Sequence, residues 1–147
     1  MIEVFKAKAV KTDVGLQVST SARDFTILMD EPESIGGTNT AMNPVEALLC
    51  SLGACQAIVA AAFAQAKGFK FEEFYLELEG DLDLDGFTGV NPNVRNGFSE
   101  IRFSVHFKTE ESQEACEEYA DFIEKTCPIC DCLTTPVKIV RTSVVRD

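Results

Sequence analysis

A long apolar segment between Asn43 and Gly68 constrains the fold of this chain more than any other feature of its sequence. Asn43 is typical of a helix N-cap, Pro44 suits the first helical position, and Glu46 completes a capping box. Gly68 is typical of the residue that ends a helix. Because apolar residues lie on nearly every face, the pattern predicts a helix over 44–67 that is buried on most sides.

The same segment is long enough to cross a membrane, but Glu46, Gln56 and Gln65 interrupt it and much of the rest is alanine, so a core helix is favoured. The net charge is −11 and the pI is about 4.5. Such a surface repels phosphate backbones and anionic lipids, so we expect neither nucleic acid nor a membrane as a partner. The opening MIEVFKAK has no apolar signal-peptide core, which predicts a cytoplasmic protein.

The remaining pattern predicts one α+β domain over residues 1–147. Strands are expected at residues 2–10, 16–20, 24–29, 76–84, 98–108 and 137–145. Thr109 is expected to cap a second helix, which should end before Pro128 and be followed by a short helical turn. The acidic face of the fourth strand and the partly basic face of the fifth predict antiparallel neighbours with charge pairs between them. We expect His106 to take part in these pairs rather than in catalysis.

Six cysteines in a reducing compartment are more often free, metal-bound or catalytic than joined in disulfides. Cys50 and Cys55 are five residues apart in the predicted helix, so their side chains lie roughly 140° apart around its axis. An apolar surrounding raises the pKa of a thiol and makes it inert, so the residues by themselves favour a packing role for both. Reactivity would need a nearby cation and a hydrogen-bond donor.

The segment CPICDC, from Cys127 to Cys132, contains a C-x-x-C motif, but it follows a helix and so lacks the thioredoxin-like context. Cys127, Cys130 and Cys132 could provide three zinc ligands, with His106 or Cys116 as the fourth. There is no second C-x-x-C motif and only one histidine, so we expect neither a metal nor another cofactor.

Three stretches in this order, "DEPESIGGTNTAMNPVEALLCSLGAC", "GF…VRNGF" and "TCPICDCLTTPVKI", resemble the OsmC/Ohr family of thiol peroxidases and their OsmC-like relatives. The resemblance runs from about residue 30 to the end. It implies antiparallel sheets wrapped around long central helices in an intertwined homodimer. It also implies organic hydroperoxides as substrates and a dithiol or a lipoylated protein as reductant.

By its position in the motifs, Cys55 matches the family's peroxidatic cysteine, and Cys127, before its proline, matches the resolving cysteine. The strict peroxidases carry a carboxylate directly after Asn-Pro, where this chain has Val45, and Glu46 follows one residue later. They also carry an arginine in the N-terminal hairpin, where this chain has none. Arg23 and Arg95 are the candidate cations in its place.

Two functions follow from these observations. The first is thiol-dependent reduction of organic hydroperoxides at a dimer interface, with a disulfide between Cys55 and Cys127 as its product. The alternative is a non-catalytic dimeric module that binds a small apolar ligand, which would be indicated by a Cys127–Cys130 disulfide while Cys55 stays reduced.

Overall fold

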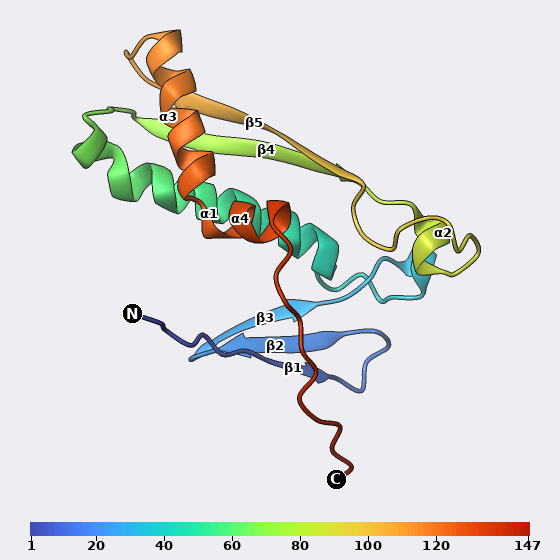
Figure 1. Cartoon of the computed structure of the whole chain (residues 1–147). Helices are drawn as coiled ribbons and strands as arrows, with labels where there is room; N and C mark the ends of the chain where they lie inside the picture. Colours follow the sequence, from blue (N-terminus) through green and yellow to red (C-terminus); the bar gives the residue numbers. More distant parts are fainter. The chain divides into compact units, whose positions relative to one another are not determined.

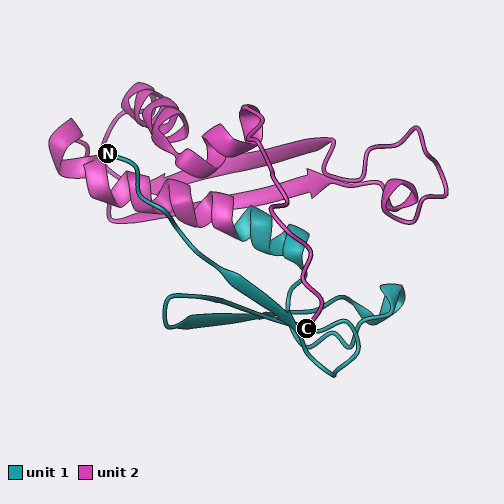
Figure 2. Ribbon diagram, turned by 60° about the horizontal axis from the view of Figure 1, so that its bottom comes forward, with its two compact units in different colours: residues 1–50 teal, residues 51–147 magenta.

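The computed structural model describes residues 1–147, which form two compact units, Met1–Cys50 and Ser51–Asp147 (Figure 2). The boundary falls within the long helix α1, Pro44–Lys67, whose first turns belong to the first unit and whose remainder belongs to the second. The two units are described in turn.

The first unit contains a three-stranded antiparallel sheet (Figure 1). Its strands follow one another in space as in the sequence: β1, Lys8–Lys11, β2, Val18–Ala22, and β3, Phe25–Met29. The three predicted N-terminal strands are therefore confirmed, although the first is shorter than expected. A short 3-10 helix, η1, Glu33–Ile35, follows the sheet.

A buried carboxylate organises the loop after β3. Asp30 is 2% exposed and accepts hydrogen bonds from the Glu31 N–H and from the N–H groups and hydroxyls of Thr38 and Thr40. The bonds from Thr38 and Thr40 outweigh the cost of burial and hold the pKa of Asp30 well below its usual range. Gly37 is required in this loop, because a Cβ there would lie 1.8 Å from the backbone oxygen of Glu31.

The predicted ends of α1 are confirmed. The Asn43 side chain accepts from the Glu46 N–H at 2.9 Å, and the Glu46 carboxylate accepts from the Asn43 N–H at 2.8 Å, which forms the capping box. Gly68 follows the last turn with a φ of 64°, a left-handed conformation that glycine adopts without strain.

The second unit pairs strands β4, Glu73–Asp81, and β5, Glu100–Lys108, in an antiparallel hairpin. Their connection contains the short helix α2, Leu84–Phe87, and β5 is followed by α3, Gln113–Thr126, and α4, Pro128–Thr134. The predicted pairing of these strands is confirmed, with ion pairs across them that join Arg102 to Glu79 and Asp81.

His106 lies on the same hairpin, where its Nε2 is 3.2 Å from Glu77 and its ring stacks on Tyr75 with centroids 4.3 Å apart. The contact expected between this histidine and the acidic strand is therefore confirmed.

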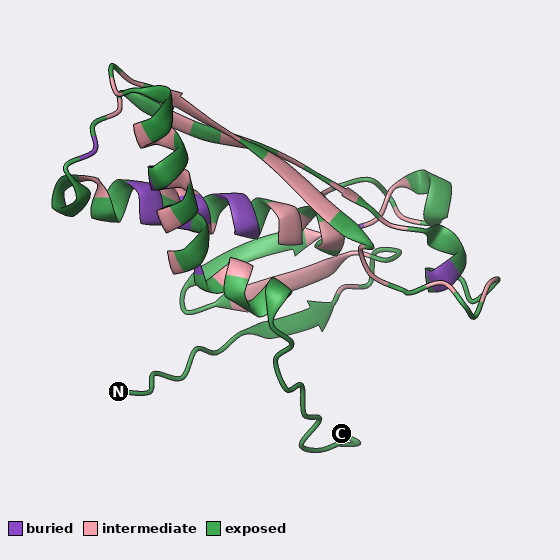
Figure 3. Cartoon of the chain, turned by 45° about the horizontal axis from the view of Figure 1, so that its top comes forward, coloured by how far each residue is buried: buried purple, intermediate pink, exposed green.

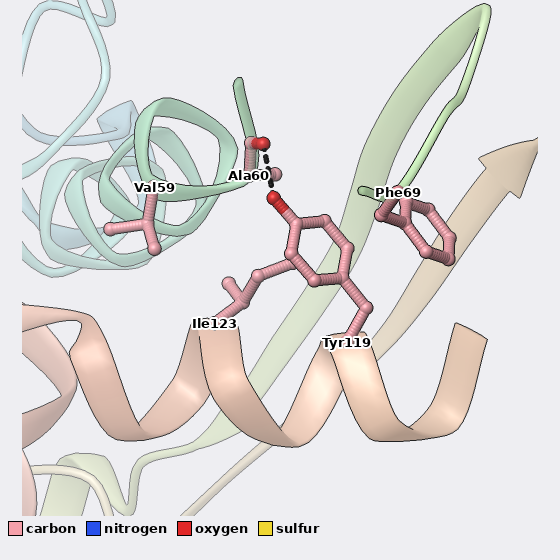
Figure 4. Close-up of a cluster of buried hydrophobic side chains, with 5 residues drawn as sticks. All are labelled: Val59, Ala60, Phe69, Tyr119 and Ile123. Atoms are coloured by element: carbon pink, nitrogen blue, oxygen red, sulfur yellow. Dashed lines mark hydrogen bonds between the residues drawn. The ribbon is translucent and has the colours of Figure 1, made fainter. Parts of the chain in front are cut away.

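The core of the second unit lies between α1 and α3 (Figure 4). It consists of five buried residues: Val59, Ala60, Phe69, Tyr119 and Ile123. The Tyr119 hydroxyl donates to the Ala60 carbonyl oxygen at 2.6 Å, and its ring stacks on Phe69 with centroids 4.4 Å apart. Gly53 allows a close approach of α1 to β4, because a Cβ there would lie 2.9 Å from a methyl group of Leu78.

Three sequence-based expectations are wrong in local detail. The fourth strand ends at Asp81 rather than near 84, because the Asp83 side chain accepts from the Asp85 N–H and starts α2. Ser112, not Thr109, caps α3, because the Thr109 hydroxyl instead donates to the Lys70 carbonyl oxygen.

The third error concerns the segment 137–145, which the sequence predicts as a strand and which has no strand partner in this chain. Valine and isoleucine side chains in it are exposed, including Ile139 at 91%.

The expectation that α1 is buried on most sides is also wrong within the single chain (Figure 3). Its buried residues are Leu52, Gly53, Gln56, Val59 and Ala60. Ile58 is 68% exposed and Phe63 is 40% exposed. By length and composition α1 could cross a membrane, with a mean hydropathy of 2.0 over an 18-residue window of which 28% is buried.

Candidate active site

The second unit brings Cys55 and Cys127 together, although about 70 residues separate them in the sequence. Cys55 lies in α1 and is partly buried, and Cys127 lies between α3 and α4 and is 0% exposed. The two thiols are close enough for the Cys55 side chain to act on the pKa of Cys127. These two cysteines, predicted as a pair, therefore meet in one place.

The chain geometry at Cys127 follows from the proline after it. Pro128 disfavours helical dihedrals at the preceding residue, and Cys127 has an extended conformation with a φ of −69° and a ψ of 114°. Cys127 thereby ends α3, through its N–H bond to the Ile123 carbonyl oxygen at 3.0 Å, and also caps α4. Its Sγ accepts from the Cys130 N–H at 3.3 Å.

Burial raises the pKa of Cys127 to about 11, and the hydrogen bond and charge of Cys55 act in the same direction. The backbone N–H groups of Cys130 and Ile129 oppose this rise. At neutral pH the Cys127 thiol therefore keeps its proton, which it can donate toward the Cys55 sulfur.

Cys130 is the third sulfur of this cluster and is partly buried. Burial is the largest cause that raises its pKa. The negative charges of Glu124, Asp131 and Cys55 raise it further. The charges that act on Cys127 and Cys130 are thus all negative. The sequence argues against a C-x-x-C dithiol because the motif follows a helix, whereas the structure directs the Cys130 N–H at the Cys127 sulfur at the start of α4.

The structure describes the other predicted site residues by their local contacts. Glu46 is engaged in the capping box of the first unit. Arg23, also in the first unit, has a φ of 54° and places its guanidinium 4.8 Å from the ring centroid of Phe25. Arg95 belongs to the connection between β4 and β5, where its carbonyl oxygen would lie 2.4 Å from a Cβ on Gly86.

The other three cysteines have different surroundings from those of Cys55, Cys127 and Cys130. Cys50 and Cys132 are exposed, while burial and the charges of Glu111 and Glu117 raise the pKa of Cys116. No group of three or more histidine, cysteine, aspartate or glutamate side chains is arranged to hold a metal ion.

Comparison with known proteins places these features in a family. The OsmC-like protein family model matches residues 37–141. A hydroperoxide reductase of Mycoplasma genitalium is 30% identical over 90 residues, which cover 59% of this chain and 58% of that relative. The match thus spans little more than half of the relative's length.

Solved structures share the fold. An OsmC-like protein of Mycoplasma pneumoniae is 23% identical, with a TM-score of 0.79, and the match covers 92% of this chain and 91% of that one. An organic hydroperoxide resistance protein OsmC of Legionella pneumophila is 19% identical, with a TM-score of 0.69 and 92% of each chain covered.

The α+β, OsmC-like fold expected from the sequence is therefore confirmed. The family match covers the Asn-Pro segment, the helix that carries Cys55 and the Cys-Pro segment that carries Cys127. The chain belongs to the OsmC-like protein family.

Proposed function

We propose that this chain reduces organic hydroperoxides with Cys55 as the attacking sulfur and Cys127 as the resolving sulfur. The observation that carries the proposal is the proximity of the two thiols, which come from separate elements of the second unit. The name of the Mycoplasma genitalium relative, hydroperoxide reductase, supports the same class of reaction.

The two sulfurs have different surroundings, and this difference suggests their roles. The raised pKa of Cys127 keeps that thiol protonated, so it is poorly suited to make the first attack. A protonated neighbour can instead donate a hydrogen bond to a thiolate on Cys55 and stabilise its negative charge. We therefore assign the attack on peroxide to Cys55.

In the first step, the Cys55 thiolate attacks the distal oxygen of the hydroperoxide. An S–O bond forms, the O–O bond breaks, and the alkoxide leaves and takes up a proton to become the alcohol. The sulfur is oxidised to a sulfenic acid as the peroxide is reduced. Cys127 then attacks the Cys55 sulfur, loses its proton and expels water, which leaves a disulfide. A dithiol or a lipoylated protein would return both thiols.

A cation near Cys55 would stabilise the charge that develops on the peroxide oxygen. We propose Arg23 or Arg95 for this role, since the charges that act on Cys127 and Cys130 are negative and cannot serve. Single Arg23→Ala and Arg95→Ala variants test the assignment: loss of the peroxidase rate in one of them supports it. Wild-type peroxidase rates in both arginine variants, together with a lower rate in His106→Ala, would contradict the assignment.

We also propose that the chain acts as a homodimer. Ile58 and Phe63 on α1 and the unpaired segment 137–145 expose apolar side chains that a second copy could cover. Such an assembly should bury more than about 2,000 Å² in total. Light scattering at micromolar concentration should give a dimer mass, and a monomer mass would refute the proposal.

The test of the main proposal uses reduced protein and an organic hydroperoxide. Cys55→Ser should abolish peroxide consumption, whereas Cys50→Ser, a change at an exposed position of the same helix, should leave it intact. Cys127→Ser should accumulate a sulfenic acid on Cys55 that a dimedone probe captures. If Cys55→Ser consumes the hydroperoxide at the wild-type rate, the proposal is refuted and the alternative of a non-catalytic, ligand-binding dimer is favoured.

A further inference from the structure

Cys130, at the start of α4, has no role in the reaction proposed above. Cys127 caps this helix and Cys130 lies in its first turn, with its N–H directed at the Cys127 sulfur at 3.3 Å. Residues three apart on a helix are neighbours, with Cβ atoms about 5–6 Å apart. A disulfide holds Cβ atoms about 3.5–4.5 Å apart, so the two Cβ atoms must approach by about 1–2 Å at the helix start for this pair to close.

Burial creates a difficulty for reduction of a Cys55–Cys127 disulfide. Cys127 is 0% exposed, so a dithiol carried by another molecule can reach a Cys55–Cys127 disulfide only at the partly buried sulfur of Cys55. Cys130 is only partly buried, and it is near enough to Cys55 for the charge of that sulfur to act on it. Cys130 therefore has access both to the sulfur pair and to the surface.

We propose that Cys130 is a second resolving thiol, which attacks Cys127 in the Cys55–Cys127 disulfide, forms a Cys127–Cys130 disulfide and releases Cys55. This inference rests on the function proposed above. Cys55 is thereby ready for another hydroperoxide before any external reductant has acted. The reductant then meets a disulfide at the start of α4, with Cys130 as the accessible sulfur.

The exchange needs no further oxidant or reductant. The Cys130 sulfur forms a bond to the Cys127 sulfur as the Cys55–Cys127 bond breaks, and Cys55 leaves as a thiolate. The proton that Cys130 loses balances the proton that Cys55 takes up. Two thiols and one peroxide thus still give one disulfide, one alcohol and one water.

The electrostatics favour the exchange at the stage when it is required. In the reduced protein, the negative charge of Cys55 contributes to the raised pKa of Cys130. Once Cys55 is in a disulfide it carries no charge, so this contribution disappears. Burial, Glu124 and Asp131 are larger causes and still raise the Cys130 pKa, so the fraction of thiolate, the attacking species, increases only in part.

The first experiment counts the hydroperoxide consumed by fully reduced protein without any reductant. Wild type should consume about two equivalents, because Cys55 is oxidised once to the disulfide and, after its release, again to a sulfenic acid. Cys130→Ser and Cys130→Ala should stop at about one equivalent. Cys132→Ser, at an exposed position two residues away, is the matched control and should behave as wild type.

The second experiment maps the disulfides after one equivalent of hydroperoxide. Wild type should contain a Cys127–Cys130 bond with Cys55 free to be alkylated, and Cys130→Ser should retain a Cys55–Cys127 bond. The Cys127–Cys130 bond by itself would also fit the non-catalytic module, so the Cys130→Ser and Cys55→Ser variants decide between the two. In Cys55→Ser no Cys127–Cys130 bond should form, which separates the exchange from direct oxidation of the C-x-x-C pair.

Failure of the exchange and failure of the proposed function give different results. If wild type stops at about one equivalent with a stable Cys55–Cys127 bond, the exchange is refuted and the proposed function stands. If Cys55→Ser forms the Cys127–Cys130 bond as fast as wild type, the exchange is also refuted. If wild type consumes no more hydroperoxide than Cys55→Ser, the proposed function fails and the exchange fails with it.

Discussion

Brief alkylation of the reduced, folded protein at pH 8 should leave Cys127 almost unmodified while the exposed Cys132 reacts. The thiolate is the species that reacts, and its fraction changes tenfold for each pH unit below the pKa. With a pKa of about 11, Cys127 has about 0.1% thiolate at pH 8, compared with about 9% for a thiol at the ordinary value of 9.0. The ionisation alone therefore slows Cys127 about 100-fold.

Isotope-coded alkylation followed by peptide mass spectrometry measures both cysteines in one sample. Steric burial could also slow Cys127, so the decisive quantity is the pH dependence of its rate. We expect the rate to rise about tenfold per pH unit from 8 to beyond 10. A rate that stops rising near pH 9 would refute the raised pKa, and reaction of Cys127 as fast as Cys132 at pH 8 would refute the assigned roles.

Removing Cys55 refines this test. Cys55→Ala eliminates the hydrogen bond and the charge that raise the pKa of Cys127, while burial, the largest cause, remains. Cys127 should therefore react faster than in wild type but still more slowly than Cys132. An unchanged Cys127 rate would contradict the contact between the two sulfurs.

Three further predictions concern stability, each measured by urea unfolding. Tyr119→Phe removes the hydroxyl that donates to a helix carbonyl and should cost about 1 kcal/mol, with a neutral result contradicting that bond. Gly37→Ala should lower the free energy of unfolding by at least ~2 kcal/mol, because the added Cβ would clash with the Glu31 backbone. Gly97→Ala, whose added Cβ would lie 3.8 Å from the nearest atom, should lower it much less. The pKa of Asp30 is lowered in the folded state, so ionised Asp30 stabilises the fold above the ordinary value of 3.8, and this stabilisation is lost as the pH falls. Asp30→Asn should therefore lower the free energy of unfolding at pH 7. The free energy of unfolding of this variant should also decline less steeply below about pH 4 than that of wild type.

The sequence predicted best those features that depend on adjacent residues. The capping box of Asn43 and Glu46, the end of α1 at Gly68 and the extended conformation before Pro128 all follow from local steric and hydrogen-bonding rules. The charge pattern of β4 and β5 was sufficient to predict their pairing, because each strand shows its polar face in its own sequence.

Features that depend on distant contacts were missed or predicted wrongly. Thr109 has a good capping side chain, but its contact with Lys70, 39 residues away, leaves the cap of α3 to Ser112. The segment 137–145 has the composition of a strand, but a strand also needs a partner, which the sequence does not specify.

The same distinction applies to the candidate site. Motif position predicted Cys55 and Cys127, but it could not reveal that burial and negative charge surround the second and third sulfurs. Those surroundings come from α3 and α4 together, through groups such as Glu124 and Asp131.

The spacing of the two paired sulfurs along the chain also has a consequence during protein synthesis. Cys55 and Cys127 are separated by about 70 residues, and ribosomes add about 5–20 residues per second. Each newly made chain therefore carries Cys55 for roughly 4–14 seconds before Cys127 has been added. During this interval a sulfenic acid on Cys55 has no Cys127 to condense with and is exposed to irreversible oxidation. A sulfenic acid that forms on Cys55 during translation should therefore persist longer than one that forms after the chain has folded.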